Sequence, residues 1–147
     1  MRACLLMLCL ALVVAGCGED QETSASSGGG GSKLAAPLTF KLTGGDAFRS
    51  DRMTVRPDGS AQVTTRAGEK PAKLTPEELS TVSDQLDGAD LEDIPEDSLT
   101  EPPMPDALSY SFVYKGREVS TDDGSLPEDL EPLTGTFIRL VDRYGLK

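Results

Sequence analysis

The first 36 residues of this chain have a composition that is unsuited to a folded core, so residues 37–147 are expected to form the folded domain. Arg2 precedes a short apolar run over residues 3–14. A membrane-spanning helix needs about 20 apolar residues, so this run is too short to remain as an anchor. A charged start, an apolar centre and small residues before a cleavage position are typical of an export signal. The residues that close the run are Val14, Ala15, Gly16 and Cys17.

These four residues resemble a bacterial lipobox, in which the signal peptidase cuts before the cysteine. The pattern predicts a lipoprotein signal peptide over residues 1–16, with Val14, Ala15 and Gly16 as its recognition residues. It also predicts a diacylglyceryl group on Cys17 and palmitate as an acyl chain, because two chains give lasting membrane attachment. The expected location is the extracytoplasmic face of the cell membrane. The alternative is an ordinary secretory signal with a chance cysteine.

Residues 17–36 are predicted to form the lipidated cysteine and a flexible tether. This segment is acidic, then rich in Ser and Thr, and contains four consecutive glycines, so it cannot bury enough apolar surface to offset its chain entropy. About fifteen such residues have a root-mean-square reach of roughly 20 Å. Cysteine is absent from residues 37–147, so a single hydrophobic core has to hold that domain together.

The net charge of −11 excludes nucleic acid as an expected partner, because phosphate binding needs clustered Lys and Arg. The charge is uneven, since residues 84–106 hold nine acidic residues and no basic one. This acidic stretch has two interpretations. It is either a solvated surface, the usual role of charge runs, or a patch that steers a basic protein towards the domain.

Local patterns predict five strands. Residues 38–43 alternate apolar and polar side chains, which indicates a half-buried strand ended by two glycines. Residues 53–56 and 61–65 flank a Pro-Asp-Gly turn and form a hairpin. Residues 108–114 and 117–121 form a second hairpin around a Lys-Gly turn.

Two helices complete the expected fold. Thr75 and Glu78 are spaced as a capping box with a proline between them, which predicts a short helix ending at Gly88. Apolar residues at steps of three and four over residues 126–144 predict a last helix that becomes regular at Pro132. The chain is therefore expected to be α+β: an antiparallel sheet of about five strands, in two hairpins plus an N-terminal strand, with two helices on one face.

Side-chain chemistry favours binding over catalysis. The chain has no histidine, which removes His-dependent triads and most zinc sites. The carboxylates of residues 87–97 lack the spacing of a calcium loop. A carboxylate hydrolase acting on glycosides stays as a minor alternative, although few aromatics are present to line a sugar cleft. No catalytic residue, metal or cofactor is predicted.

Two loops are the candidate partner-binding sites, since loops held by a rigid scaffold commonly carry recognition. One follows the first strand and the other is the proline-rich segment 94–107, which we expect to be exposed. The alternative is that these loops are ordinary surface connections, with Phe48 or Leu99 folded back into the core. Tyr110 and Tyr114 are expected in the core or on the sheet. The candidate residues are Gly44, Gly45, Asp46, Phe48, Leu99 and Met104.

Three short motifs link this domain to a known family: Thr43-Gly44-Gly45, Pro105-Asp106 followed by Tyr110, and Leu126-Pro127-Glu128-Asp129-Leu130 with Pro132-Leu133. Through these motifs, residues 38–144 resemble the emfourin family, small bacterial proteins whose namesake inhibits protealysin, a thermolysin-like zinc protease. Family members continue the double glycine with an apolar and then a small residue, whereas Asp46-Ala47-Phe48 follows it here.

The resemblance implies a domain that binds and blocks a thermolysin-like protease. Such an enzyme offers an apolar pocket beside a zinc ion that accepts oxygen ligands. Asp46 or a backbone carbonyl could reach the metal while Phe48 or Leu99 fills the pocket. The competing hypothesis is a lipid-tethered envelope protein that binds or supports other envelope components without inhibiting an enzyme.

The lipid anchor can be tested directly. Replacing Cys17 with Ser removes the acylated thiol, so the Cys17→Ser variant should leave the membrane fraction and appear in the soluble fraction of host cells. The measurement is immunoblotting of both fractions. A variant that stays in the membrane fraction would show that another feature anchors the chain.

Overall fold

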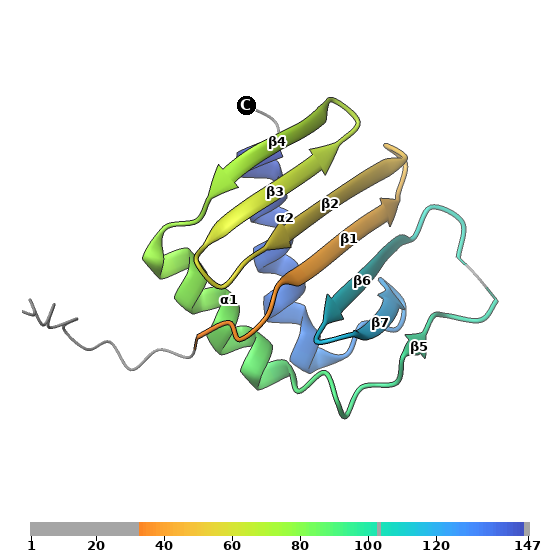
Figure 1. Cartoon of the computed structure of the whole chain (residues 1–147). Helices are drawn as coiled ribbons and strands as arrows, with labels where there is room; N and C mark the ends of the chain where they lie inside the picture. Colours follow the sequence, from red (N-terminus) through yellow and green to blue (C-terminus); the bar gives the residue numbers. More distant parts are fainter. Residues whose placement is uncertain (1–32, 103, 146–147) are drawn as a thin grey trace, which may run out of the picture.

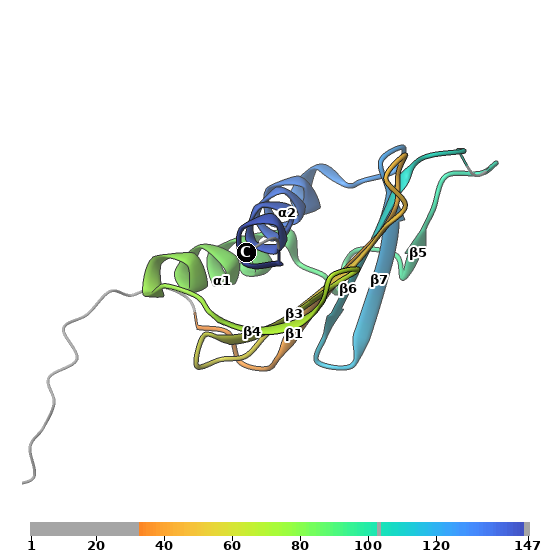
Figure 2. The same ribbon diagram turned by 90° about the horizontal axis from the view of Figure 1, so that it is seen from above.

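The computed structural model describes residues 33–102 and 104–145. The predicted signal peptide, Cys17 and most of the predicted tether lie outside these described residues. Seven strands form one sheet in the order β4-β3-β2-β1-β6-β7-β5, with the two helices on one face (Figures 1 and 2). The elements are β1 (Leu38–Gly44), β2 (Arg49–Val55), β3 (Ser60–Thr65), β4 (Gly68–Lys73), α1 (Pro76–Ala89), β5 (Asp97–Ser98), β6 (Leu108–Tyr114), β7 (Arg117–Asp122), a 3-10 turn (Glu128–Leu130) and α2 (Glu131–Gly145).

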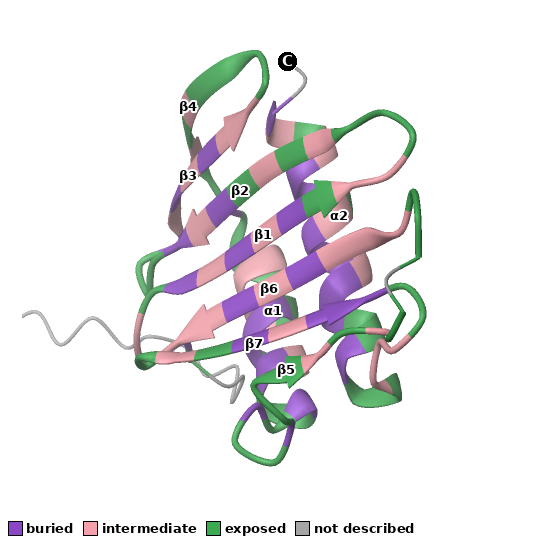
Figure 3. Cartoon of the chain, turned by 90° about the vertical axis from the view of Figure 1, so that its right-hand side faces the viewer, coloured by how far each residue is buried: buried purple, intermediate pink, exposed green. Residues whose placement is uncertain are grey.

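Strand β1 lies at the centre of the sheet and pairs over its whole length with β2 on one side and β6 on the other. Its alternation is the predicted one, because Leu38, Phe40 and Leu42 are fully buried beneath the helices. Thr39 and Lys41 face the open side of the sheet, where side chains are only partly covered. Figure 3 shows the same banding of buried and partly exposed residues along the neighbouring strands.

The capping box of α1 is confirmed. The Glu78 amide donates to Thr75 Oγ1 at 3.2 Å, and the Thr75 amide donates to Glu78 Oε2 at 2.8 Å. The helix ends at Ala89, one residue after the predicted glycine stop, and Asp90 caps it in the left-handed conformation with φ of 37°. Local sequence signals therefore define this element at both ends.

Helix α2 begins at Glu131 after the 3-10 turn, within one residue of the expected start. Its last turn is fastened to the cap of α1. The Tyr144 hydroxyl donates to Glu78 Oε2 at 2.8 Å, and Arg143 bonds the other oxygen of the same carboxylate. These bonds lower the pKa of Glu78, although burial opposes the shift. One glutamate thus caps α1 and holds the end of α2.

The centre of the core is a cluster of three fully buried phenylalanines from β1, β6 and α2. The Phe40 ring lies 5.0 Å from the Phe137 ring and 5.1 Å from the Phe112 ring, measured between centroids. Phe112 meets Phe137 edge to face at 6.1 Å. Rings at these separations pack favourably beyond their area burial, so they join the sheet to α2.

The α+β class is confirmed, but the sheet has seven strands instead of the expected five and is not wholly antiparallel. Strand β4 carries Gly68, Pro71 and three charged residues, so it shows no apolar alternation. It forms an outer edge, where a proline is tolerated. Strand β5 has two residues, Asp97 and Ser98, and pairs in parallel with β7, which makes the sheet mixed. The prediction of an exposed loop over residues 94–107 is therefore wrong at two places, because β5 pairs with β7 and the apolar side chain of Ile94 is buried.

Strand β2 also starts earlier than expected, at Arg49 instead of Met53. Asp51 lies opposite Leu42 on the helix-covered face, where an apolar residue would be usual. Its carboxylate is paired with Arg49 Nε at 2.7 Å, which satisfies the charge. Because Asp51 faces the core, the start of β2 lacks the apolar–polar alternation by which a strand is recognised in a sequence.

Two glycines provide a matched test of the fold. A Cβ on Gly44, which has φ of 93°, would overlap the carbonyl oxygen of Ala107, whereas a Cβ on Gly88 would meet nothing within 4 Å. We expect Gly44→Ala to lower the free energy of unfolding by about 2 kcal/mol or more. Gly88→Ala should raise it by up to about 1 kcal/mol, because alanine favours the helix. Urea unfolding measures both, and equal effects would contradict the described turn.

Candidate protein-binding surface

The two candidate loops meet at one end of the sheet. We call this surface the loop end and define it by the β1–β2 turn (residues 44–48), the described residues 98–102 and 104–107 of the segment 98–107, and the turn after β7 (residues 122–125). The Gly45 amide donates to the Ala107 carbonyl at 3.3 Å, which joins the first two parts directly. In Figure 1 the end of β1 and the start of β6 lie side by side there.

Three apolar side chains stand out from this surface. Phe48 is 70% exposed, Leu99 is 46% exposed and Met104 is 44% exposed. They are the exposed large hydrophobic residues of the part of the chain that the structure describes. Phe48 and Leu99 therefore do not fold back into the core, so this alternative to a binding role is wrong. All three are sequence-predicted candidates.

Phe48 is held outward by an unusual backbone. Its φ of 49° is left-handed, which is uncommon for a bulky residue, and Gly44 and Gly45 before it also have positive φ, of 93° and 70°. The Phe48 amide donates to the Gly45 carbonyl at 2.8 Å and closes the turn. Strain of this kind persists where the surrounding structure imposes it and is often associated with a functional site.

Asp122, which the sequence did not single out, fastens the segment 98–107. Its carboxylate accepts hydrogen bonds from the Thr100 hydroxyl at 2.7 Å and amide at 2.8 Å. It also accepts from the Gly124 amide and the Ser125 hydroxyl, both at 2.9 Å. These hydrogen bonds, chiefly those from Thr100, lower the pKa of Asp122 to about 2. An Asp-Asp-Gly turn is visible in the sequence, but no local signal pairs it with Thr100.

Asp123 holds the start of β6 in the same way. One carboxylate oxygen accepts the Leu108 amide at 3.0 Å, and the other accepts the Tyr110 hydroxyl. Burial and this hydrogen bond raise the pKa of Tyr110, so its phenol stays protonated. Tyr110 is buried in the core as expected, and Tyr114 is half-buried on the sheet. Asp122 and Asp123 therefore attach Thr100 and the start of β6 to the turn after β7.

A shallow hollow of about 360 Å³ lies between the two loops. Arg49, which reaches it, is engaged elsewhere. Its guanidinium bonds Asp51 and Asp142, each at 2.7 Å. The residues that line the hollow are Gly45, Asp46, Ala47, Arg49, Asp106, Leu108 and Asp123.

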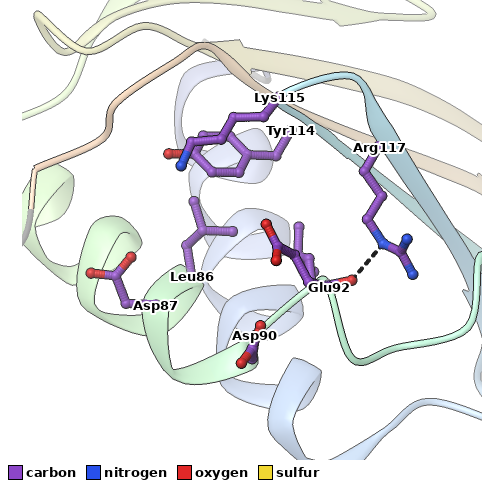
Figure 4. Close-up of a pocket in the computed structure, with 8 residues that line it drawn as sticks. Leu86, Asp87, Asp90, Glu92, Tyr114, Lys115 and Arg117 are labelled. Carbon is purple, nitrogen blue, oxygen red and sulfur yellow. Dashed lines mark hydrogen bonds between the residues drawn. The ribbon is translucent and has the colours of Figure 1, made fainter.

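A second pocket of about 370 Å³ lies between the C-terminal half of α1 and the β6–β7 turn (Figure 4). Arg117 at its margin donates to the Leu91 carbonyl at 2.7 Å and to the Ile94 carbonyl, so it fastens the chain after α1. This pocket is at the opposite end of β6 from the loop end, because Tyr114 pairs with Leu38. Its other charged lining residues are Asp87, Asp90, Glu92 and Lys115.

The acidic stretch 84–106 is consequently not one patch. Its first half surrounds the pocket after α1, whereas Glu101 and Asp106 belong to the loop end. Among the described residues, no group of three or more acidic, His or Cys side chains is placed to hold a metal, and no helix is long and apolar enough to cross a membrane. The sequence matches no family model and no curated protein.

The hydrogen bonds to Asp122 predict a pH dependence. Its pKa is about 2 in the fold, against an ordinary value of 3.8, so the unfolded chain binds more protons between these values. The stability that Asp122 contributes is complete above about pH 4 and is lost as the pH falls towards 2. Urea midpoints from pH 5 to pH 2 should therefore fall more steeply for the natural chain than for Asp122→Asn. The charge-matched Asp87→Asn should keep the natural slope, and equal slopes for all three would contradict this role.

Proposed function

We propose that this chain is a lipoprotein tethered through Cys17, whose loop end binds a protein partner, and that the partner is a thermolysin-like zinc protease that it inhibits. The observation that carries the proposal is the arrangement of Phe48, Leu99 and Met104. The described part of the chain exposes large apolar side chains at these three positions, and all belong to two loops joined at Gly45.

Contact of these apolar side chains with water is unfavourable in the free protein. A partner that covers them removes this free-energy cost. Hydrogen bonds hold Thr100, Leu108 and the Phe48 turn in place, which lowers the conformational entropy that these residues would lose on binding. A partner with an apolar pocket would accept Phe48 as an anchor, since buried aromatic residues dominate many interfaces.

A thermolysin-like cleft fits this chemistry. It has an apolar pocket beside a zinc ion, and zinc accepts carboxylate oxygen as a ligand. Asp46 is exposed and precedes Phe48 by two residues, so an oxygen ligand and an apolar side chain are presented on one turn. The emfourin-like motifs support the same target.

The second candidate is a non-inhibitory envelope protein that uses the same loop end. It is favoured by the Asp46-Ala47-Phe48 sequence, which departs from the emfourin pattern after the double glycine. In both cases the loop end is a better contact than the sheet edges. Edge strand β4 contains Pro71 and edge strand β5 has two residues, and such edges resist strand addition.

Inhibition is tested with the mature chain carrying Cys17→Ser and a purified thermolysin-like protease. We expect micromolar or tighter inhibition by the natural loop sequence, with Phe48→Leu retaining most of it. Phe48→Gly should weaken inhibition by about tenfold or more, because the anchor is removed. Phe48→Gly stays folded, since glycine adopts φ of 49° without strain.

Urea unfolding of each variant is the control for folding. Inhibition that is equal for the natural chain and Phe48→Gly would place the contact elsewhere. No inhibition, together with Phe48-dependent recovery of other envelope proteins, would favour the second candidate.

A further inference from the structure

We infer that the partner of the loop end carries basic side chains around the pocket that receives the apolar residues. This inference rests on the proposed function and adds the charge of the partner. It follows from which carboxylates at the loop end are engaged within the domain and which are not.

Three carboxylates at the loop end have no partner among the residues that the structure describes. Asp46, Glu101 and Asp106 are exposed, and their side chains make no hydrogen bond or ion pair with any residue in the described part of the chain. Asp46 from the β1–β2 turn and Asp106 from the segment before β6 both line the hollow between the loops. Asp122 and Asp123 differ, because their oxygens are used by Thr100 and Tyr110.

Among the described residues, the basic side chain of Arg66 offsets only part of these charges. Arg49 lines the hollow, but Asp51 and Asp142 already neutralise it. Arg66 reaches the β1–β2 turn and donates to the Ala47 carbonyl at 3.2 Å. The segment 98–107 contains no Lys or Arg. Because the Ala47 carbonyl is neutral, Arg66 keeps its charge, whereas Lys41 beside Leu99 is paired with Glu118 at 2.8 Å. Three carboxylates against one arginine leave the described part of the loop end with a net negative charge.

An interface over the apolar side chains would also take water from these carboxylates. Burying an unpaired carboxylate is costly unless a basic group replaces its water. A partner with Lys or Arg around an apolar pocket meets both needs and is steered towards the loop end before contact. An anionic lipid surface or a second copy of this loop end would instead bring like charges together.

Two peptide probes test the charge of the partner. One is Lys-Leu-Lys-Phe-Lys-Leu-Lys, and the other replaces every lysine with glutamate. Each is titrated into the mature chain carrying Cys17→Ser, and backbone amide shifts are followed by NMR. We expect the basic peptide to shift the amides of Gly45 and Gly124, and its affinity to fall about tenfold between 50 and 500 mM NaCl.

Matched triple variants locate the effect. Asp46→Asn with Glu101→Gln and Asp106→Asn should weaken binding of the basic peptide by about tenfold. The control, Asp87→Asn with Asp90→Asn and Glu92→Gln, removes the same charge from the pocket after α1. It should leave the shifts at the loop end unchanged.

Several outcomes would overturn the inference. They are equal binding of the acidic peptide, binding by neither peptide, loss of binding in the control triple variant, and binding of phosphatidylglycerol vesicles at Gly45. The protease assay is read separately. Inhibition that is insensitive to salt and to Glu101→Gln with Asp106→Asn, which leaves Asp46 in place, would reject a basic rim and keep the proposed function. Charge-dependent peptide binding without inhibition would reject the protease target alone.

Discussion

The contact between Phe40, Phe112 and Phe137 joins the central strands of the sheet to α2, and the rest of the structure depends on it. The three rings come from the beginning, the later part and the end of the domain sequence, so their burial closes the chain on itself. Buried side chains of the flanking strands and of α1, such as Val63 and Val82, belong to the same core. Deleting one such ring removes both apolar burial and the filling of the core, a loss of about 3–5 kcal/mol.

Outside this core, hydrogen bonds attach the loops to the sheet. Asp122 holds Thr100, and Asp123 holds the start of β6, through hydrogen bonds. Phe48 is 70% exposed, so it lies at the surface and is not part of the internal packing. Apolar packing holds the core together, whereas hydrogen bonds attach the loops to it. This division makes a binding role for the loop end physically reasonable.

Features with local sequence signals could be predicted, including the alternation of β1, the Pro-Asp-Gly hairpin and the Thr75 capping box. Strand β4 could not, because an edge strand with Pro71 has no alternation to detect. The Asp122 hydrogen bonds join positions 22 residues apart and leave no local pattern. The candidate loops followed from composition, but the outward position of Phe48 depends on the left-handed backbone of its turn, which has no signal in the sequence at a phenylalanine.

Strand β1 has a mechanical consequence for a tethered domain. The described chain enters β1 at Leu38, on the side of the N-terminal segment, and leaves it at Gly44, where the loop end begins. A pull between a membrane anchor and a bound partner would therefore run along this strand over a length of about 23 Å. Hydrogen bonds to β2 and β6 lie across that direction, so they share the load together instead of breaking in succession. The central strand would then resist force between the membrane and the partner.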